Sequence, residues 1–261
     1  MKKSILIMIL YLFILIGLLP HNLGKKLVKF KITNKNNAKA KVPRNLESDN
    51  YIVLYFNKDY TYSRGFQNSY RKNISYIINQ KYPNKKYTSK NELDVHKGFG
   101  IEIHLNTAIR SLYSFFDSDY DSNMKNLVFI DFSNFNSISV FTIRYLLYGC
   151  SSLKSIDFSN FDTSQVTDMI YMFYNCNALK SIDLSNFNTS KVEHMDAMFH
   201  SCSSLTSIDL SNFVTSQVID MSYMFHSCSS LTSIHLSNFD TSQVTDMSYM
   251  FYNCNALKSI N

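Results

Sequence analysis

Glycine and proline are scarce in this 261-residue chain, which holds six and three of them respectively. This scarcity excludes a collagen-like or glycine-rich linker chain, so Ser, Asn, Asp and Thr must form most of the turns. Six glycines also argue against a phosphate-binding loop, and the sequence contains no G-x-S-x-G, H-E-x-x-H or G-x-G-x-x-G motif. We therefore expect no enzyme, and an active site within residues 46–126 is the least favoured hypothesis.

The composition indicates a folded protein, because 45% hydrophobic and 15% aromatic residues exclude disorder throughout. The net charge of +6 is the sum of two unlike parts. Residues 1–100 carry 19 Lys+Arg against 5 Asp+Glu, whereas residues 101–261 carry 7 against 15. The basic residues accompany no nucleic-acid-binding module, so we expect no nucleic-acid partner.

The N-terminus has the layout of an export signal. Two lysines precede an uncharged, apolar run over residues 4–19, which Pro20 closes. Its 15-residue apolar core, residues 5–19, is shorter than the ~20 residues of a membrane-spanning helix, which favours a cleaved signal peptide over a signal anchor. No second apolar run has membrane length, so membrane contact would arise only from residues 1–20 or from a C-terminal anchor outside this sequence. Residues 21–45 are predicted to be a flexible basic linker, and the mature protein to be secreted or on the cell surface.

A repeat of 26 residues dominates the second half of the chain. The five cysteines are spaced by this period at Cys150, Cys176, Cys202, Cys228 and Cys254. Segments 157–182 and 235–260 differ at only three of 26 positions, which indicates duplication of repeat blocks. A period of this length is typical of leucine-rich repeats, in which each coil buries its apolar edge against its neighbours.

One coil shows the pattern on which the fold prediction depends. Residues 181–185 alternate polar and apolar side chains, which predicts a short parallel strand, and residues 186–190 are typical of a turn. The spacing of Val192, Met195, Met198 and Phe199 predicts a short helix. The predicted fold class is an α/β solenoid, a leucine-rich-repeat-like array of 26-residue strand-turn-helix coils.

The array is predicted to comprise about five coils over residues 127–261, the last of them incomplete. We accordingly expect the sequence to be a fragment of a longer array. Residues 46–126 are predicted to form a small α/β N-terminal cap with a degenerate repeat, and a separate ligand-binding domain is the alternative. The cap should contain strands at 51–56 and 101–105 and helical stripes at 66–78 and 109–116.

The repeated motif S-I-D-L-S-N-F-D-T-S-x-V-T-D-M-x-x-M-F-x-x-C-x-x-L resembles that of BspA-type leucine-rich surface proteins. The likeness covers about half of the chain, from Leu127 onward. It implies a surface protein that adheres to host matrix, to host cells or to other microbial surfaces. It implies no catalytic residues.

Two sets of side chains are predicted to form a ligand-binding face. An aspartate column should project from successive strands at Asp131, Asp157, Asp183 and Asp209. Its carboxylates should repel one another, which favours a bound calcium ion or raised pKa values, and the competing interpretation is a solvated face without cofactor or metal. The second set is a tyrosine column, Tyr171, Tyr223 and Tyr249, because exposed Tyr is a good contact residue.

The cysteine column is predicted to be structural. Each Cys follows the apolar face of the expected helix, which favours buried, reduced thiols over disulfides between neighbouring coils. The leading functional hypothesis is adhesion or protein binding through the solenoid face. The alternative is a surface coat or spacer protein without a dedicated ligand.

Overall fold

The computed structural model describes residues 50–57, 59–62, 74–80, 86–87, 93–95, 99–105 and 109–260. The predicted signal segment 1–20 and linker 21–45 lie outside these residues. Within the described part, no helix has the length and apolar character needed to cross a membrane.

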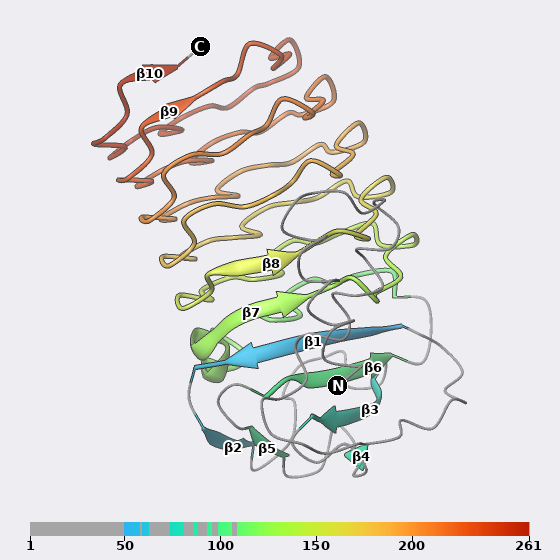
Figure 1. The fold of residues 1–261 in the computed structure, drawn as a ribbon. Coiled ribbons are helices and arrows are strands. Elements are labelled where there is room, and N and C mark those ends of the chain that lie inside the picture. Colours follow the sequence, from blue (N-terminus) through green and yellow to red (C-terminus); the bar gives the residue numbers. More distant parts are fainter. Residues whose placement is uncertain are drawn as a thin grey trace, which may run out of the picture. The chain divides into compact units, whose positions relative to one another are not determined.

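The largest sheet has six strands in the order β4-β3-β6-β1-β7-β8 (Figure 1). Their bounds are Tyr51–Phe56 for β1, Ile74–Asn79 for β3, Lys86–Tyr87 for β4, Ile101–Leu105 for β6, Leu127–Asp131 for β7 and Ser155–Asp157 for β8. Strand β1 pairs antiparallel with both β6 and β7, while β7 and β8 are parallel. The strands predicted at 51–56 and 101–105 are confirmed.

Two smaller sheets complete the strands of the described residues. Strands β2 (Tyr60–Tyr62) and β5 (Leu93–Val95) pair antiparallel. Strands β9 (Ser233–Ile234) and β10 (Ser259–Ile260) pair parallel and lie one 26-residue period apart. Parallel pairing of equivalent positions therefore occurs at both ends of the repeat region.

The buried side chains of β1 show where the core begins. Ile52, Leu54 and Phe56 are buried, and they join a continuous core that extends through the repeats to Met250. The columns of Leu, Phe, Cys, Met and Val that recur every 26 residues together supply most of this core. The buried apolar positions follow the repeat because each repeat covers the apolar side chains of the next.

Successive repeats lie side by side in chain order, and we call residues 137–260 the repeat stack (Figure 1). Parallel bridges join positions 26 residues apart along a single line through Thr142, Asp168, His194, Asp220 and Asp246, and a further bridge joins Thr142 to Ser111. The 26-residue spacing therefore corresponds to one step along the stack.

The helix predicted within each repeat is absent. In the segment 169–176, alternate N–H groups donate to the following repeat: Met169 to His194 O at 3.0 Å, and Tyr171 to Asp196 O at 3.1 Å. The intervening N–H groups donate three residues back, as Met172 does to Met169 O. An α-helix would direct every N–H four residues back, so half of its bonds are replaced here by bonds between repeats.

Left-handed residues prevent a helix at these positions. Tyr145, Tyr171, Ala197, Tyr223 and Tyr249 share a φ between 50° and 57°, and the position four residues later is also left-handed. A right-handed helix cannot pass through such residues. The three-and-four spacing of apolar residues is real, but it arises from a chain of turns.

Side-chain oxygens form the turns that glycine and proline would otherwise supply. In these turns the side-chain oxygen of an Asp or an Asn accepts a hydrogen bond from the backbone N–H two residues later. One repeat contains three of them, at Asp157 to Ser159 N, Asp162 to Ser164 N and Asp168 to Ile170 N, with distances of 2.8–3.0 Å. The expectation that Ser, Asn, Asp and Thr build the turns is correct for this repeat.

The predicted fold class is wrong. The described residues contain no α-helix, and their one helical element is the five-residue 3-10 helix η2 (Ser122–Asn126). Of the helix expected over 66–78, residues 66–73 lie outside the described residues and residues 74–78 belong to β3. Within 109–116, residues 113–116 form a turn and no residue is helical. No strand forms at 181–185. The structure is an arrangement of small mixed sheets, turns and irregular coil, and an α/β solenoid of strand-turn-helix coils does not describe it.

Candidate functional site

A ladder of aromatic rings runs along the repeat stack. Its members, which we call the ring ladder, are Tyr148, Tyr174, His200, His226 and Tyr252. Neighbouring ring centroids are 4.5, 4.4, 4.4 and 5.1 Å apart, and every pair is stacked within 25° of parallel. These contacts arise because each ring occupies the same position in consecutive repeats.

The predicted tyrosine column lies beside the ring ladder. Tyr145 stacks on Tyr171 and Tyr223 stacks on Tyr249, with 5.0 Å between centroids in each pair. Tyrosines of this column also meet the ladder edge to face, as Tyr249 does with Tyr252 at 5.7 Å. Ala197, which is 1% exposed, interrupts the column between the two pairs.

The exposed part of this aromatic surface lies toward the C-terminal end of the stack. Tyr223, which is followed by a further repeat, is 37% exposed, and the equivalent Tyr145 and Tyr171 are half-buried. Tyr249 and Tyr252 are 56% and 53% exposed, and they belong to the last repeat of the sequence, where no further repeat stacks on them. The ring ladder and the tyrosine column together place exposed aromatic edges and hydroxyl groups along several repeats. Tyr side chains bury much area on binding at low cost in conformational entropy, so this surface is suited to contact with a large partner.

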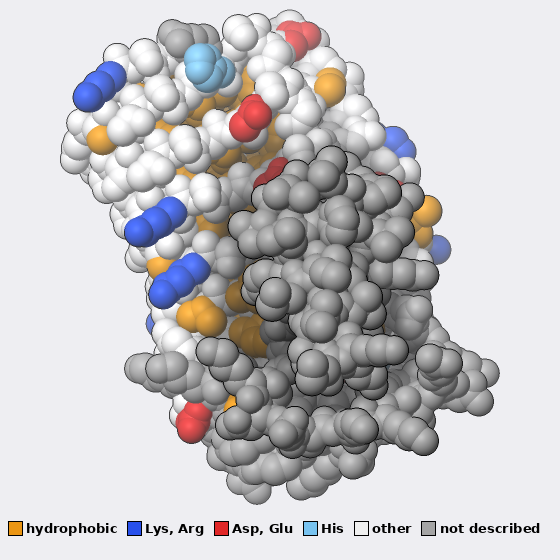
Figure 2. Space-filling view, viewed as in Figure 1, with side chains coloured by type: hydrophobic (Ala, Val, Ile, Leu, Met, Phe, Trp, Pro, Cys, Tyr) orange, Lys and Arg blue, Asp and Glu red, His pale blue; other side chains and the backbone are white. Residues whose placement is uncertain are grey.

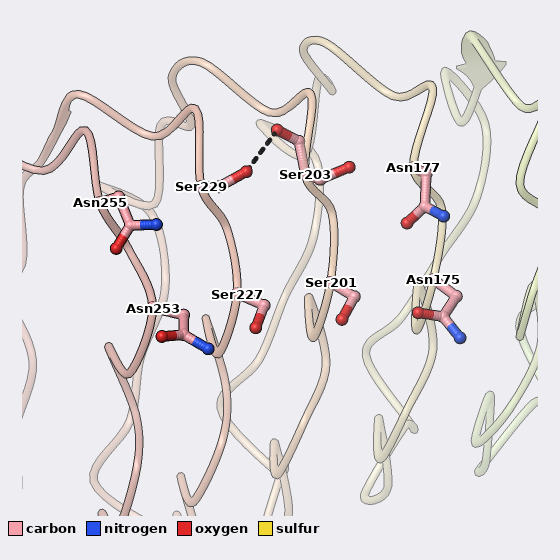
Figure 3. Close-up of a pocket in the computed structure, with 8 residues that line it drawn as sticks. All are labelled: Asn175, Asn177, Ser201, Ser203, Ser227, Ser229, Asn253 and Asn255. Atoms are coloured by element: carbon pink, nitrogen blue, oxygen red, sulfur yellow. Dashed lines mark hydrogen bonds between the residues drawn. The ribbon is translucent and has the colours of Figure 1, made fainter.

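A polar hollow of about 500 Å³ adjoins the ring ladder (Figure 3). Two rows of side chains line it: Asn175, Ser201, Ser227 and Asn253 in one row, and Asn177, Ser203, Ser229 and Asn255 in the other. The first row follows the ladder residues directly in the chain. Two hydrogen bonds of 2.9 Å join hollow and ladder, between Ser201 Oγ and His200 Nδ1 and between Ser227 Oγ and His226 Nδ1.

The hollow contains no charged side chain. All eight lining residues are Asn or Ser. Burial, followed by the proximity of His226, lowers the pKa of His200 to about 4, so its imidazole is neutral at pH 7. Figure 2 shows that the Lys, Arg, Asp and Glu side chains on the described surface facing the viewer are few and stand apart from one another.

One acidic group near the tyrosine column has a shifted pKa. Burial, with repulsion from Asp220, raises the pKa of Asp196 to about 6. Arg144 lies 3.8 Å from Asp168 and over the ring of Tyr145 at 5.1 Å, which places a cation on the same part of the surface. Charge on this side of the tyrosine column therefore depends on pH in the mildly acidic range.

The predicted aspartate column has a local role. Asp131, Asp157, Asp183 and Asp209 each accept a hydrogen bond from the N–H of the serine two residues later, at 2.7–3.0 Å. The hydroxyl and N–H of Ser185 lower the pKa of Asp183, and the N–H and hydroxyl of Ser211 lower that of Asp209. This direction is opposite to the rise expected from repulsion, because hydrogen bonds to the ionised form outweigh it.

The described residues contain no group of three or more His, Cys, Asp or Glu side chains that could hold a metal ion. Hydrogen bonds, ion pairs and ring contacts among these residues do not join the aspartate column to Tyr171, Tyr223 or Tyr249.

All five cysteines are free thiols, buried except for the half-buried Cys254. Each Sγ donates to a backbone carbonyl of the preceding repeat, as Cys202 does to Phe173 O at 3.2 Å and Cys228 to Phe199 O at 3.1 Å. Burial raises the pKa of the thiols, Cys202 included, so they stay protonated at neutral pH. The column is part of the structure that connects one repeat to the next.

Two further columns connect the repeats, and sequence reasoning missed both. Thr189 Oγ1 donates to Val214 O at 2.9 Å and accepts from Val214 N at 2.8 Å. Asn212 Nδ2 donates to Leu184 O at 3.0 Å and to Phe187 O at 2.9 Å. Both positions recur every 26 residues, so invariance of a polar residue across the repeats was the signal that could have found them.

The fold and these columns define the class of the protein as one built from stacked 26-residue repeats joined by polar and aromatic ladders. Residues 110–260 match the model of a family described as "Mycoplasma protein of unknown function, DUF285". The match covers more than half of the chain, so the protein belongs to the DUF285 family. No curated protein and no solved structure matches the chain.

Proposed function

We propose that this protein is an exported, surface-displayed repeat protein that binds a macromolecular partner, with adhesion as its role. The resemblance to BspA-type surface proteins supports this proposal, and the aromatic surface of the repeat stack is the observation that carries it. The partner is a host matrix or cell-surface macromolecule, or the surface of another microbe.

The aromatic surface supports binding because its rings exceed what the core requires. The core is closed by the buried Leu, Phe, Met and Cys columns, whereas Tyr223 remains 37% exposed although another repeat stacks on its own repeat. Stacking between repeats holds the rings in fixed orientations, which lowers the entropy lost on association. A partner that spans several repeats would contact several rings at once.

A surface coat or spacer protein is the second candidate. Its support is the aspartate column, whose carboxylates are occupied by local turns, as Asp183 is with Ser185 N. A repeat protein whose polar columns serve its own backbone needs no ligand. The two candidates differ in whether replacing exposed rings changes any measurable binding.

The test measures binding of the full chain to host cells and immobilised matrix proteins. Tyr223→Ala combined with Tyr249→Ala should reduce binding by about tenfold or more, since exposed aromatic residues dominate interfaces. The matched control is Tyr120→Ala, because Tyr120 is 64% exposed and lies before the repeat stack. Binding that is absent, or equal in all three proteins, would refute the aromatic surface as the binding site and favour the coat or spacer.

A further inference from the structure

The polar hollow is produced by a departure from the repeat. The outer repeats read Tyr-Asn-Cys-Asn at 174–177 and 252–255, whereas the two repeats between them read His-Ser-Cys-Ser at 200–203 and 226–229. Serine is shorter than asparagine, so the middle repeats form the floor of the hollow and the asparagines form its two ends (Figure 3). The periodic pattern alone would have left a uniform surface here.

The groups in the hollow suit a neutral ligand that both donates and accepts hydrogen bonds. Each serine hydroxyl and each asparagine amide offers donor and acceptor atoms. Ser229 Oγ donates to Ser203 O at 3.4 Å, and the serine hydroxyls beside the histidines bond to the ring ladder. The amides of Asn177 and Asn255 have no side-chain hydrogen bond to a described residue, and both residues are exposed.

Other classes of ligand fit the hollow poorly. It has no charged residue to pair with an anion or cation, and no apolar side chain to receive a lipid or an amphipathic helix. An extended peptide cannot add to it as a strand, because the backbone N–H groups of Asn175, Ser201 and Ser227 already donate to the next repeat at 2.7–2.9 Å. Recognition must come from side chains alone.

We propose that this hollow binds a neutral oligosaccharide. The vicinal hydroxyl groups of a sugar match the mixed donors and acceptors of the two rows. Adjacent repeats are ~4.8 Å apart, so the floor of two repeats has the length of a disaccharide unit in an extended glycan. This inference rests on the proposed function, and it names the class of partner.

The test exposes the full chain to immobilised neutral glycans, namely oligomers of N-acetyllactosamine, mannose, glucose and N-acetylglucosamine, with heparin as a charged comparator. We expect binding to at least one neutral glycan, unchanged by raised salt because no ion pair contributes. Failure of every neutral glycan to bind, or binding of heparin alone, would overturn the inference.

Two variants locate the site. Replacing Ser201, Ser203, Ser227 and Ser229 by Asn fills the floor with residues that the outer repeats carry natively, and should weaken glycan binding at least ~tenfold. Asn177→Ala with Asn255→Ala removes an amide at each end, at positions without left-handed backbone, and should also weaken it. The matched control, Ser185→Asn with Ser211→Asn, alters two exposed serines outside the hollow and should bind normally.

The outcomes separate the inference from the proposed function. Cell or matrix binding that disappears in the ring variant and persists in the filled variant would leave adhesion standing and overturn the glycan assignment. Glycan binding that is equal in the filled variant and its control would likewise overturn the assignment of the hollow. Loss of glycan and cell binding together in the filled variant would support both proposals.

Discussion

Thr189→Val tests whether a buried hydroxyl joins neighbouring repeats. Thr189 is fully buried at 0% exposure, and its Oγ1 makes two hydrogen bonds to the backbone of Val214, at 2.9 and 2.8 Å. Valine has nearly the same shape, so the substitution removes both bonds and leaves the packing of the side chain largely unchanged. The C=O and N–H of Val214 lose their partner.

The expected loss follows from those two backbone groups. A buried polar group left without a partner costs about 1–3 kcal/mol. The side chain of Val214 is 46% exposed, so water can compensate part of the loss at that residue. We therefore expect a total decrease of about 2 kcal/mol in the free energy of unfolding, rather than the sum of two full penalties.

Urea unfolding measured by circular dichroism gives the global effect, and hydrogen exchange at the Val214 amide gives the local one. Each 1.4 kcal/mol corresponds to about tenfold faster exchange. Thr232→Val is the control, because Thr232 is exposed and its bond to Thr206 O is 3.3 Å long. A Thr189→Val protein within about 0.5 kcal/mol of wild type, with unchanged exchange at Val214, would refute the reasoning.

Three other predictions concern the ladders. Asn212→Ala should lower the free energy of unfolding in urea by about 1–3 kcal/mol, because three carbonyls of the preceding repeat lose the donor that they share. Asn188→Ala, at an exposed position, is the control, and an equal effect of the two substitutions would contradict this prediction. Thiol labelling of the native protein should modify Cys254 first and the four buried cysteines only on unfolding; simultaneous labelling of all five would show that the column is not protected. The pKa of His200 is lowered to about 4 in the folded protein, so between pH 4 and 6.5 the unfolded chain binds more protons at this residue and stability rises with pH. The pKa of Asp196 is raised to about 6, so between pH 4 and 6 the folded chain binds more protons at this residue and its contribution to stability falls with pH. Asp196→Asn should therefore steepen the rise of stability across this range and His200→Tyr should abolish it, as followed by thermal unfolding at each pH, and identical pH profiles would disprove both shifts.

Sequence alone determined which positions are equivalent and which of them are apolar. The period of 26 residues and the buried columns of Leu, Phe and Cys follow from the sequence periodicity. The strand at Tyr51–Phe56 follows from its short, continuous apolar run. These features are predictable because burial of an apolar side chain depends mainly on its own chemistry and on local periodicity.

Tertiary structure decided how the backbone between those positions is bonded. The spacing of Val192, Met195 and Met198 is compatible with a helix, but Ala197 is left-handed and its N–H donates to Ser222 O at 2.8 Å. A carbonyl 25 residues along the chain becomes a partner only once the repeats lie side by side. The helix propensity of a short segment does not depend on a residue so far along the chain, so the helix prediction was wrong.

The candidate site depends on the same stacking. Tyr and His recur in the sequence, but only the short distance between repeats makes them a continuous ladder. The exchange of Asn for Ser at 201, 203, 227 and 229 is visible in the sequence, yet it becomes a hollow only where two such repeats lie between longer neighbours. The sequence determined the side chains, and the distance between adjacent repeats determined which surfaces they form.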